Sequence, residues 1–247
     1  LIALIMMRTS TAKKSVKMKR IANEQWQTTV KGDLMGKFYT FDMGQGECPG
    51  VFAKAVGVNG KRGAIINFSK TDPEGWAQDQ HPVTKSPADL VIYEMLFRDF
   101  TKSQDIEGAM AELDYIENLG VNAVQLMPVQ EFDGNLSWGY NPNHWFALDK
   151  YYGTREEYKA FIDECHSRGI AVIIDVVYNH ATGSHTWAKM WWNGSATAEN
   201  NPFFNVLPTH PYNVYHDMNH ENEMVKEHVK RSLEYLLTEY DVDGFRF

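Results

Sequence analysis

The sequence contains few cysteines. Its 247 residues include two, Cys48 and Cys165. Cys48 lies in a stretch typical of a loop, and Cys165 lies on the apolar face of an expected helix, so a disulfide framework is not expected. The cysteines therefore exclude a small disulfide-stapled scaffold and leave the redox compartment open.

The sequence also lacks an excess of positive charge. Lys and Arg number 24 against 32 Asp and Glu, which gives a formal net charge of -8. Because polyanions bind basic surfaces, nucleic acid is not expected as a partner, and a neutral ligand fits better. The seven tryptophans, several of them in expected loops, favour flat apolar contact surfaces for such a ligand.

The apolar segment that opens the chain is too short to cross a membrane. Residues 1–7 (LIALIMM) are apolar, whereas a spanning helix needs about 20 such residues. No basic segment precedes them, as it would in a signal peptide. We interpret this segment as a β-strand and expect no membrane span. Because the chain opens inside one expected strand and closes inside another, we expect an excerpt of a longer protein.

Turn residues and prolines divide the chain into three parts. Residues 1–68 consist of short alternating runs broken by turns, which predicts a small β-sandwich. Residues 69–88 contain three prolines and show neither helical nor strand periodicity, which indicates a linker. Residues 89–247 form the expected second domain.

Strand and helix patterns alternate in this second domain. Expected strands cover residues 90–97, 121–129, 170–177 and 244–247. The first is apolar on both faces, which predicts a strand buried beneath helices. Expected helices cover residues 107–119 and 154–169, with Thr154 and Glu157 in capping-box spacing, and a third carries Val225, Val229, Leu233, Leu236 and Leu237 on one face. This order predicts parallel βαβ units with right-handed crossovers.

Two architectures fit such units: an open doubly wound sheet and the first half of an eight-stranded barrel. No glycine-rich phosphate turn follows the first strand, so a dinucleotide-binding fold loses its main support. Long insertions follow the second strand (residues 129–153) and the third strand (residues 178–222). Both architectures build their sites at the carboxyl ends of the strands, so we expect the chemistry in these insertions.

The segment SWGYNPNHW (residues 137–145) allows two interpretations. Gly139 and Pro142 are typical of a turn with aromatics packed beneath it. Alternatively, Trp138 and Tyr140 present their ring faces to a sugar, whose axial C–H surface is apolar. The residues alone leave both open.

The segment DVVYNH (residues 175–180) leaves the third strand with a group of polar side chains. Asp175, Asn179 and His180 would lie at the carboxyl end of a parallel sheet, where such sheets place their sites. Asn179 also offers an amide oxygen to a hard cation such as calcium. In HDMNH (residues 216–220), two histidines have the i, i+4 spacing of a zinc helix, but no Glu follows the first, and Asn219 fits a helix entrance better.

These segments together resemble conserved regions of the α-amylase superfamily, glycoside hydrolase family 13. DVVYNH resembles the first region, and DGFRF (residues 243–247) resembles the second, which reads Gly-Phe-Arg-x-Asp with the aspartate as nucleophile. The N-terminal KGDLMGKFYTFDM (residues 31–43) is similar to the starch-binding β-sandwich of type I pullulanases. The resemblance implies an α/β fold, with an N-terminal β-sandwich followed by the first half of a (β/α)8 TIM barrel.

The resemblance also implies roles for individual residues. Tyr140 matches the aromatic platform under the sugar at the cleavage site, and His180 matches the histidine that hydrogen-bonds that sugar. Arg246 matches the arginine that orients the nucleophile and keeps it ionised, as a nearby cation does for a carboxylate. Trp138 and Asp175 are expected to bind substrate. No cofactor is required, and Asn179 matches a calcium ligand of many relatives.

The implied activity is retaining hydrolysis of α-glucans such as starch, glycogen or pullulan, by an enzyme of pullulanase or α-amylase type. The nucleophile would follow Phe247 and the acid would lie on a later strand, so this segment alone is expected to be inactive. Leu136-Ser137 and Asn141-Pro142 depart from the pullulanase signature, which has Tyr-Asn and Asp-Pro at these places, so α-1,6 and α-1,4 specificity both stay open. The alternatives are a 1,4-α-glucan branching transferase and an inactive glycan-binding homologue. The family context favours an exported or cell-surface enzyme.

Overall fold

The N-terminal part of the chain forms an antiparallel sheet. The computed structural model describes residues 2–6, 13–22, 25–82 and 86–247. The sheet order is β2-β1-β5-β6, β7 also pairs with β5, and a separate two-stranded ladder joins β3 and β4. The strands are β1 (Ile2–Met6), β2 (Lys13–Lys17), β3 (Lys19–Arg20), β4 (Trp26–Gln27), β5 (Phe38–Asp42), β6 (Glu47–Cys48) and β7 (Gly63–Ala64). The strand predicted at the start of the chain is thus confirmed as β1, while the sandwich stays a prediction.

Short 3-10 turns lie between β6 and β7 and between this sheet and the rest of the chain. They are η1 (Val58–Gly60), η2 (Phe68–Lys70), η3 (Trp76–Gln78) and η4 (Pro87–Asp89). The described residues between 69 and 88 contain no α-helix or β-strand, as their prolines predict. This segment is held against the larger domain, because the buried Lys159 ammonium forms ion pairs with Asp72 and Glu239 and lies over the Trp76 ring.

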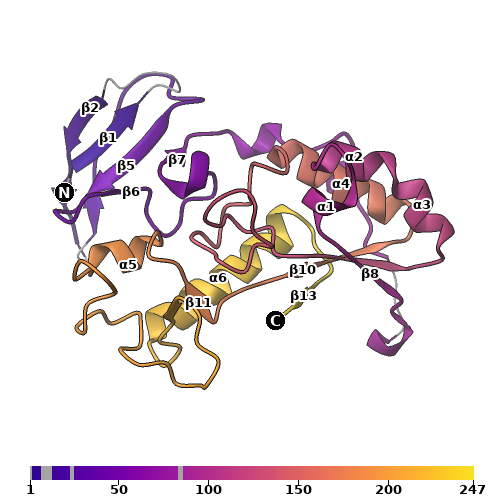
Figure 1. The fold of residues 1–247 in the computed structure, drawn as a ribbon. Coiled ribbons are helices and arrows are strands. Elements are labelled where there is room, and N and C mark those ends of the chain that lie inside the picture. Colours follow the sequence, from indigo (N-terminus) through magenta and orange to yellow (C-terminus); the bar gives the residue numbers. More distant parts are fainter. Residues whose placement is uncertain (1, 7–12, 23–24, 83–85) are drawn as a thin grey trace.

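Four parallel strands form the second sheet, as predicted. They are β8 (Ile92–Met95), β9 (Ala123–Leu126), β10 (Ala171–Asp175) and β13 (Gly244–Arg246). The sheet order β13-β10-β9-β8 is the order of the chain itself. Figure 1 labels β8, β10 and β13 of this sheet. A dinucleotide-binding sheet reverses its direction at a switch point, whereas a barrel adds each new strand on the same side. The order therefore favours the barrel architecture.

Helices alternate with these strands. They are α1 (Phe97–Phe100), α2 (Ile106–Ala111), α3 (Leu113–Asn118), α4 (Arg155–Ser167), α5 (Thr186–Met190) and α6 (Glu223–Glu239). The predicted helix over residues 107–119 is divided at Glu112 into α2 and α3. The capping box of α4 is confirmed, since the Thr154 hydroxyl accepts from the Glu157 amide and the Glu157 carboxylate accepts from the Thr154 amide.

Two details of the sequence prediction are wrong. The strand expected over residues 90–97 is not buried on both faces, because Val91 and Ile92 are exposed and Phe97 already belongs to α1. Among the described residues β8 pairs with β9 alone, so one of its edges has no strand beside it. The entrance of α6 is Asn222 rather than Asn219, because the Asn222 carboxamide accepts from the Met224 amide.

One large core joins the parallel sheet, its helices and the two long loops that follow β9 and β10. The second of these loops contains α5 and a small ladder of β11 (His180–Ala181) with β12 (His216–Asp217). Its Trp187 ring is 5% exposed and stacks on Phe203 at 4.2 Å between centroids. Among the described residues, no helix has both the length and the apolar character that a membrane crossing requires. The loops are therefore packed parts of the fold that can hold side chains in place.

Candidate active site

An ion pair joins the carboxyl ends of the two adjacent strands β10 and β13. Asp175 is the last residue of β10, Arg246 is the last residue of β13, and the parallel register pairs them directly. Paired residues project toward the same face of a sheet, and the Arg246 Nη1 accordingly lies 2.7 Å from the Asp175 Oδ2. The Asp175 side chain is 1% exposed and that of Arg246 is 52% exposed, so the pair reaches from the core to the surface.

Tyr140 joins this pair from the loop that follows β9. Its hydroxyl donates to the same Asp175 Oδ2 at 2.7 Å, and the Arg246 guanidinium donates to the hydroxyl at 3.4 Å. Burial, and then the hydrogen bond to Asp175, raise the pKa of Tyr140 to about 12, so the phenol keeps its proton. Two side chains from separate segments, Tyr140 and Arg246, are thus fixed to one oxygen of the Asp175 carboxylate.

The charge of Asp175 is set by opposing influences. Burial raises the pKa of its carboxyl, while the hydrogen bond from Tyr140 and the charge of Arg246 lower it. Attraction to Asp175 in turn raises the pKa of Arg246. The second oxygen of Asp175, Oδ1, is buried and has no hydrogen-bond partner among the described residues.

His180 supports Tyr140 from behind. Its Nε2 lies 2.8 Å from the Tyr140 carbonyl oxygen, and because a carbonyl can only accept, Nε2 carries the proton. The Asn179 carboxamide donates to the other ring nitrogen at 3.3 Å. Burial lowers the pKa of His180, so the imidazole is neutral near pH 7 and hydrogen-bonds as a single tautomer.

A tight turn places the aromatic residues before Tyr140. Gly139 has φ +92°, and a Cβ there would lie 2.3 Å from the Pro128 carbonyl oxygen, so the turn requires glycine. The Arg98 guanidinium donates to the Ser137 carbonyl at 3.0 Å, and the Ser137 hydroxyl accepts from the Gly139 amide. Trp138, at the tip of this turn, is 62% exposed and therefore accessible to a ligand.

A cavity of about 540 Å³ opens over the ion pair. Its lining combines Tyr140, Asp175 and Arg246 with apolar wall residues and with Asn179. The structure therefore brings four of the six predicted site residues to one cavity, while His180 lies behind Tyr140 and Trp138 stands on the adjoining turn. The roles assigned to these residues stay predictions.

Sequence reasoning did not identify two residues at this place. His220 lines the cavity, with its Nε2 lying 2.8 Å from the Tyr178 carbonyl oxygen, and Tyr215 stacks on the His180 ring at 5.7 Å between centroids. The HDMNH spacing singled out His220 for a zinc helix, but His216 lies in β12 and His220 lies before α6, so the two do not share a helix. Tyr215 carries a positive φ of 51°, which sequence periodicity does not indicate.

The surroundings of Asn179 bear on the calcium ion that the sequence suggests. Calcium takes six to eight oxygen ligands. One side-chain amide hydrogen of Asn179 is committed to His180, and its main-chain carbonyl accepts from the Met218 amide. Among the described residues it adjoins no group of three carboxylate or histidine donors. A calcium ligand at Asn179 therefore stays a prediction, and no step is assigned to a metal.

The described residues that line the cavity can assist a reaction, but they do not include a pair of catalytic carboxyl groups. Asp175 is the single carboxylate among the described residues that line it, and its Oδ2 is bound by Tyr140 and Arg246. A retaining glycosidase needs two carboxyl groups about 5 Å apart on either side of the scissile bond. The described residues can stack a ring, donate hydrogen bonds and supply a guanidinium beside such groups.

Comparison with known proteins assigns the chain to a family. Residues 66–216 match the model of the α-amylase catalytic domain. The sequence is 30% identical to a pullulanase of Bacillus subtilis over 95% of this chain and 37% of that protein. It is 33% identical to the chloroplastic isoamylase SU1 of Zea mays over 74% of this chain and 26% of that protein.

Solved structures agree with the sequence matches. The crystal structure of a pullulanase from Paenibacillus barengoltzii, in complex with maltohexaose and α-cyclodextrin, covers 100% of this chain and 44% of its own, with a TM-score of 0.84 and 28% identity. The chain thus spans less than half the length of these relatives. The four parallel strands correspond to part of the TIM barrel of such enzymes.

Proposed function

Because the chain belongs to the α-amylase catalytic-domain family, we propose that the complete gene product is a retaining glycoside hydrolase of α-glucans. The observation that carries the proposal is the joint anchoring of Tyr140 and Arg246 on Asp175, at the carboxyl ends of adjacent barrel strands and beneath an open cavity. A TIM barrel places its chemistry at this end of its strands. The relatives named above as pullulanase and isoamylase support the substrate class.

In the proposed mechanism each residue has a separate task. The Tyr140 ring stacks on the apolar face of the sugar at the cleavage site, and Trp138 extends this contact. Arg246 holds the nucleophile, which the family motif places directly after Phe247, in its ionised form. That carboxylate attacks the anomeric carbon while a carboxylic acid protonates the leaving oxygen, and water then releases the sugar.

The N-terminal sheet has a proposed role in substrate binding. We propose that residues 1–68 form a starch-binding β-sandwich beside the barrel, with residues 69–88 as the linker. The antiparallel order β2-β1-β5-β6 supports this, and Trp26 on β4 is 44% exposed and offers a ring to a glucan. Weaker retention on insoluble starch by a Trp26→Ala variant, with unchanged hydrolysis of short maltooligosaccharides, would agree with it.

Product analysis tests the activity. The complete gene product incubated with amylose should release reducing ends in proportion to time. New branch points without reducing ends would instead identify a branching transferase, and binding without either product would identify an inactive glycan-binding homologue. Parallel assays on pullulan separate α-1,6 from α-1,4 cleavage. Activity lost on treatment with a calcium-selective chelator and restored by calcium would support a calcium ion at Asn179, and activity that survives the chelator would show that none is required.

A further inference from the structure

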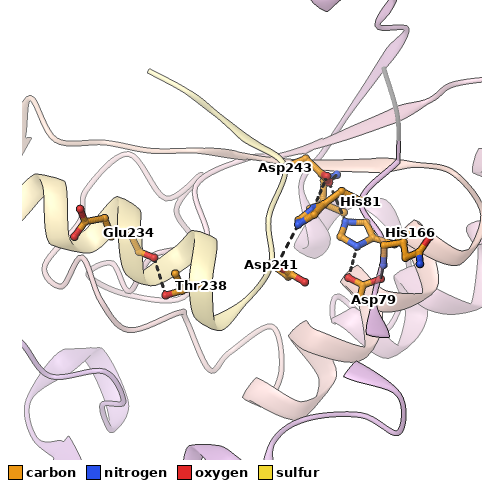
Figure 2. Close-up of polar contacts among 9 residues, drawn as sticks. Asp79, His81, His166, Glu234, Thr238, Asp241 and Asp243 are labelled. Atoms are coloured by element: carbon orange, nitrogen blue, oxygen red, sulfur yellow. Dashed lines mark hydrogen bonds and ion pairs between the residues drawn. The ribbon is translucent and has the colours of Figure 1, made fainter. Parts of the chain in front are cut away.

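A cluster of two histidines and three aspartates lies at the opposite end of the parallel sheet from the cavity. It consists of His81, from the segment before β8, His166 on α4, and Asp243 before β13, flanked by Asp79 and Asp241 (Figure 2). Asp243 is anchored at the start of β10, because its Oδ2 accepts from the Val172 amide at 2.6 Å. The proposed hydrolysis uses none of these side chains.

The two imidazoles converge on one carboxylate. The His81 Nδ1 lies 2.9 Å from the Asp243 Oδ1, and the His166 Nε2 lies 2.9 Å from the Asp243 Oδ2. One donor atom from each of these three residues lies within 4.8 Å of the others. Ligands of one zinc ion, each about 2 Å from the metal, are roughly 3–4 Å apart, so small side-chain movements suffice to admit an ion. His81 is free to make them, because its side chain is 52% exposed.

Each imidazole also has a carboxylate on its outer side. The His166 Nδ1 lies 2.5 Å from the Asp79 Oδ2, and the His81 Nε2 lies 3.3 Å from the Asp241 Oδ1. Histidines that bind metals commonly donate their second N–H to a carboxylate, which fixes the tautomer and makes the ligating nitrogen more basic. Both histidines therefore have the outer partner that a ligand needs, and both turn their other nitrogen toward Asp243 (Figure 2).

A divalent cation can replace two protons in this arrangement without a change in its total charge. All four ring nitrogens face carboxylate oxygens, so hydrogen bonding alone satisfies the cluster only when both imidazoles carry two protons. A divalent cation in place of the two inner protons supplies the same charge and leaves each imidazole neutral, with its outer proton on Asp79 or Asp241.

We propose that His81, His166 and Asp243 bind a zinc ion at this place. Two imidazoles and one carboxylate are ligands that zinc accepts, and the exposed side of His81 leaves the remaining position to water. The ion links three segments that are distant in sequence: the chain before β8, α4, and the turn between α6 and β13. It therefore acts as a structural staple on the face of the barrel away from the cavity.

The test compares zinc binding by the complete gene product and by its His81→Ala variant. Both are stripped with a chelator, dialysed and titrated with zinc chloride in a calorimeter. The wild type should bind one more zinc ion per chain than the variant, and zinc should raise the Tm of the wild type more. Because His81 is half-exposed, the variant should fold. Equal stoichiometry in the two proteins overturns the proposal.

Two further variants show whether zinc binds at this site in particular or at any histidine–aspartate pair. His210 forms such a pair with Asp217 at 3.0 Å and belongs to no group of three metal donors among the described residues, so His210→Ala should keep the wild-type stoichiometry. Asp241→Asn keeps the three ligands but loses an outer carboxylate, and should weaken zinc binding about 10- to 100-fold. Cobalt(II) should give a visible absorption band with the wild type and not with His81→Ala. The assignment would be refuted if His210→Ala lost the same zinc ion as His81→Ala. It would also be refuted if Asp241→Asn bound zinc with wild-type affinity.

Discussion

Tyr140 has two parts that can be separated by substitution. Its ring faces the cavity, and its hydroxyl binds the Asp175 carboxylate that also holds Arg246. Tyr140→Phe keeps the ring, so KM should stay within about twofold, while kcat should fall roughly tenfold, since a hydrogen bond to a charged group contributes about 1.5–3 kcal/mol. Tyr140→Ala should raise KM about tenfold as well. Steady-state kinetics on a soluble maltooligosaccharide measure both.

The outcome distinguishes positioning from simple contact. If Tyr140→Phe changed KM as strongly as Tyr140→Ala and left kcat alone, the hydroxyl would act on the substrate rather than on Asp175. Arg231→Lys is a matched control, because Arg231 forms an exposed i, i+4 pair with Glu227 on α6 and should leave both constants unchanged.

At the residue scale, the sequence indicated which residues lie at the site better than it indicated which of them contact one another. The motifs indicated Tyr140, Asp175 and Arg246, and the structure places all three at one cavity. That one oxygen of Asp175 binds the other two depends on the register of β10 against β13, which pairs residues 71 positions apart. The meeting of His81 with His166 likewise depends on how a proline-containing segment folds back on α4. Local periodicity carries no information on either.

At the scale of elements, the turn before Tyr140 is the part most sensitive to a single added methyl group. Gly139→Ala combines a left-handed φ with a Cβ that would collide with the Pro128 carbonyl, so the turn must move. We expect a loss of activity of at least tenfold and a lower Tm. Gly134→Ala in the same loop is the control, because its φ of +78° is equally unfavourable but nothing lies within 4 Å of the added Cβ.

The two variants should differ in activity more than in stability. Gly134→Ala should cost about 1 kcal/mol and keep its kcat, since strain at φ alone does not displace Tyr140. Thermal melting and initial rates on a maltooligosaccharide give the two values. Equal activity in both variants would mean that the Gly139 turn does not position the aromatic residues.

Elements with strong periodicity were predicted well, and those at boundaries were not. The capping box at Thr154 and the apolar spacing on α4 and α6 depend on neighbours in sequence, which are visible without a structure. The start of α1 at Phe97 and the exposure of Ile92 depend on which strands lie beside β8. An apolar run is compatible with one strand or with a shorter strand followed by a helix, so composition could not place the boundary at Phe97.

At the scale of the whole molecule, the N-terminal segment is held to the barrel through the loop after β9. The His144 Nε2 lies 2.9 Å from the Gly60 carbonyl oxygen, and the Asn59 side chain accepts from the Gly134 amide. Burial lowers the pKa of His144 to about 4, so the ring is neutral at pH 7 and donates to Gly60. This contact makes the buried polar groups of the loop important for the stability of both parts.

Glu131 lies at the centre of this loop and should make stability depend on pH. Its carboxyl group is fully buried, lies 2.6 Å from the Lys150 Nζ through Oε1, and is close to the buried Asp149. Burial, with repulsion from Asp149, raises the pKa of Glu131 to about 8, compared with 4.5 in an unfolded chain. Between these values the folded state binds more protons than the unfolded state. The free energy of unfolding should therefore fall, by on the order of a few kcal/mol, as pH rises from about 4.5 to about 8.

Replacement of the carboxyl group by an amide tests this dependence. Glu131→Gln keeps an acceptor for Lys150 but cannot ionise, so its Tm relative to that of the wild type should increase steadily between pH 5 and pH 8. Glu234→Gln, which removes an exposed carboxylate 3.7 Å from Lys230 on α6, should follow the wild type across the same range. If the Glu131→Gln and wild-type melting curves shifted in parallel with pH, the buried carboxyl group would not be the source of the dependence. The loss of stability at high pH would then have to originate outside the contact between the loop and the N-terminal segment.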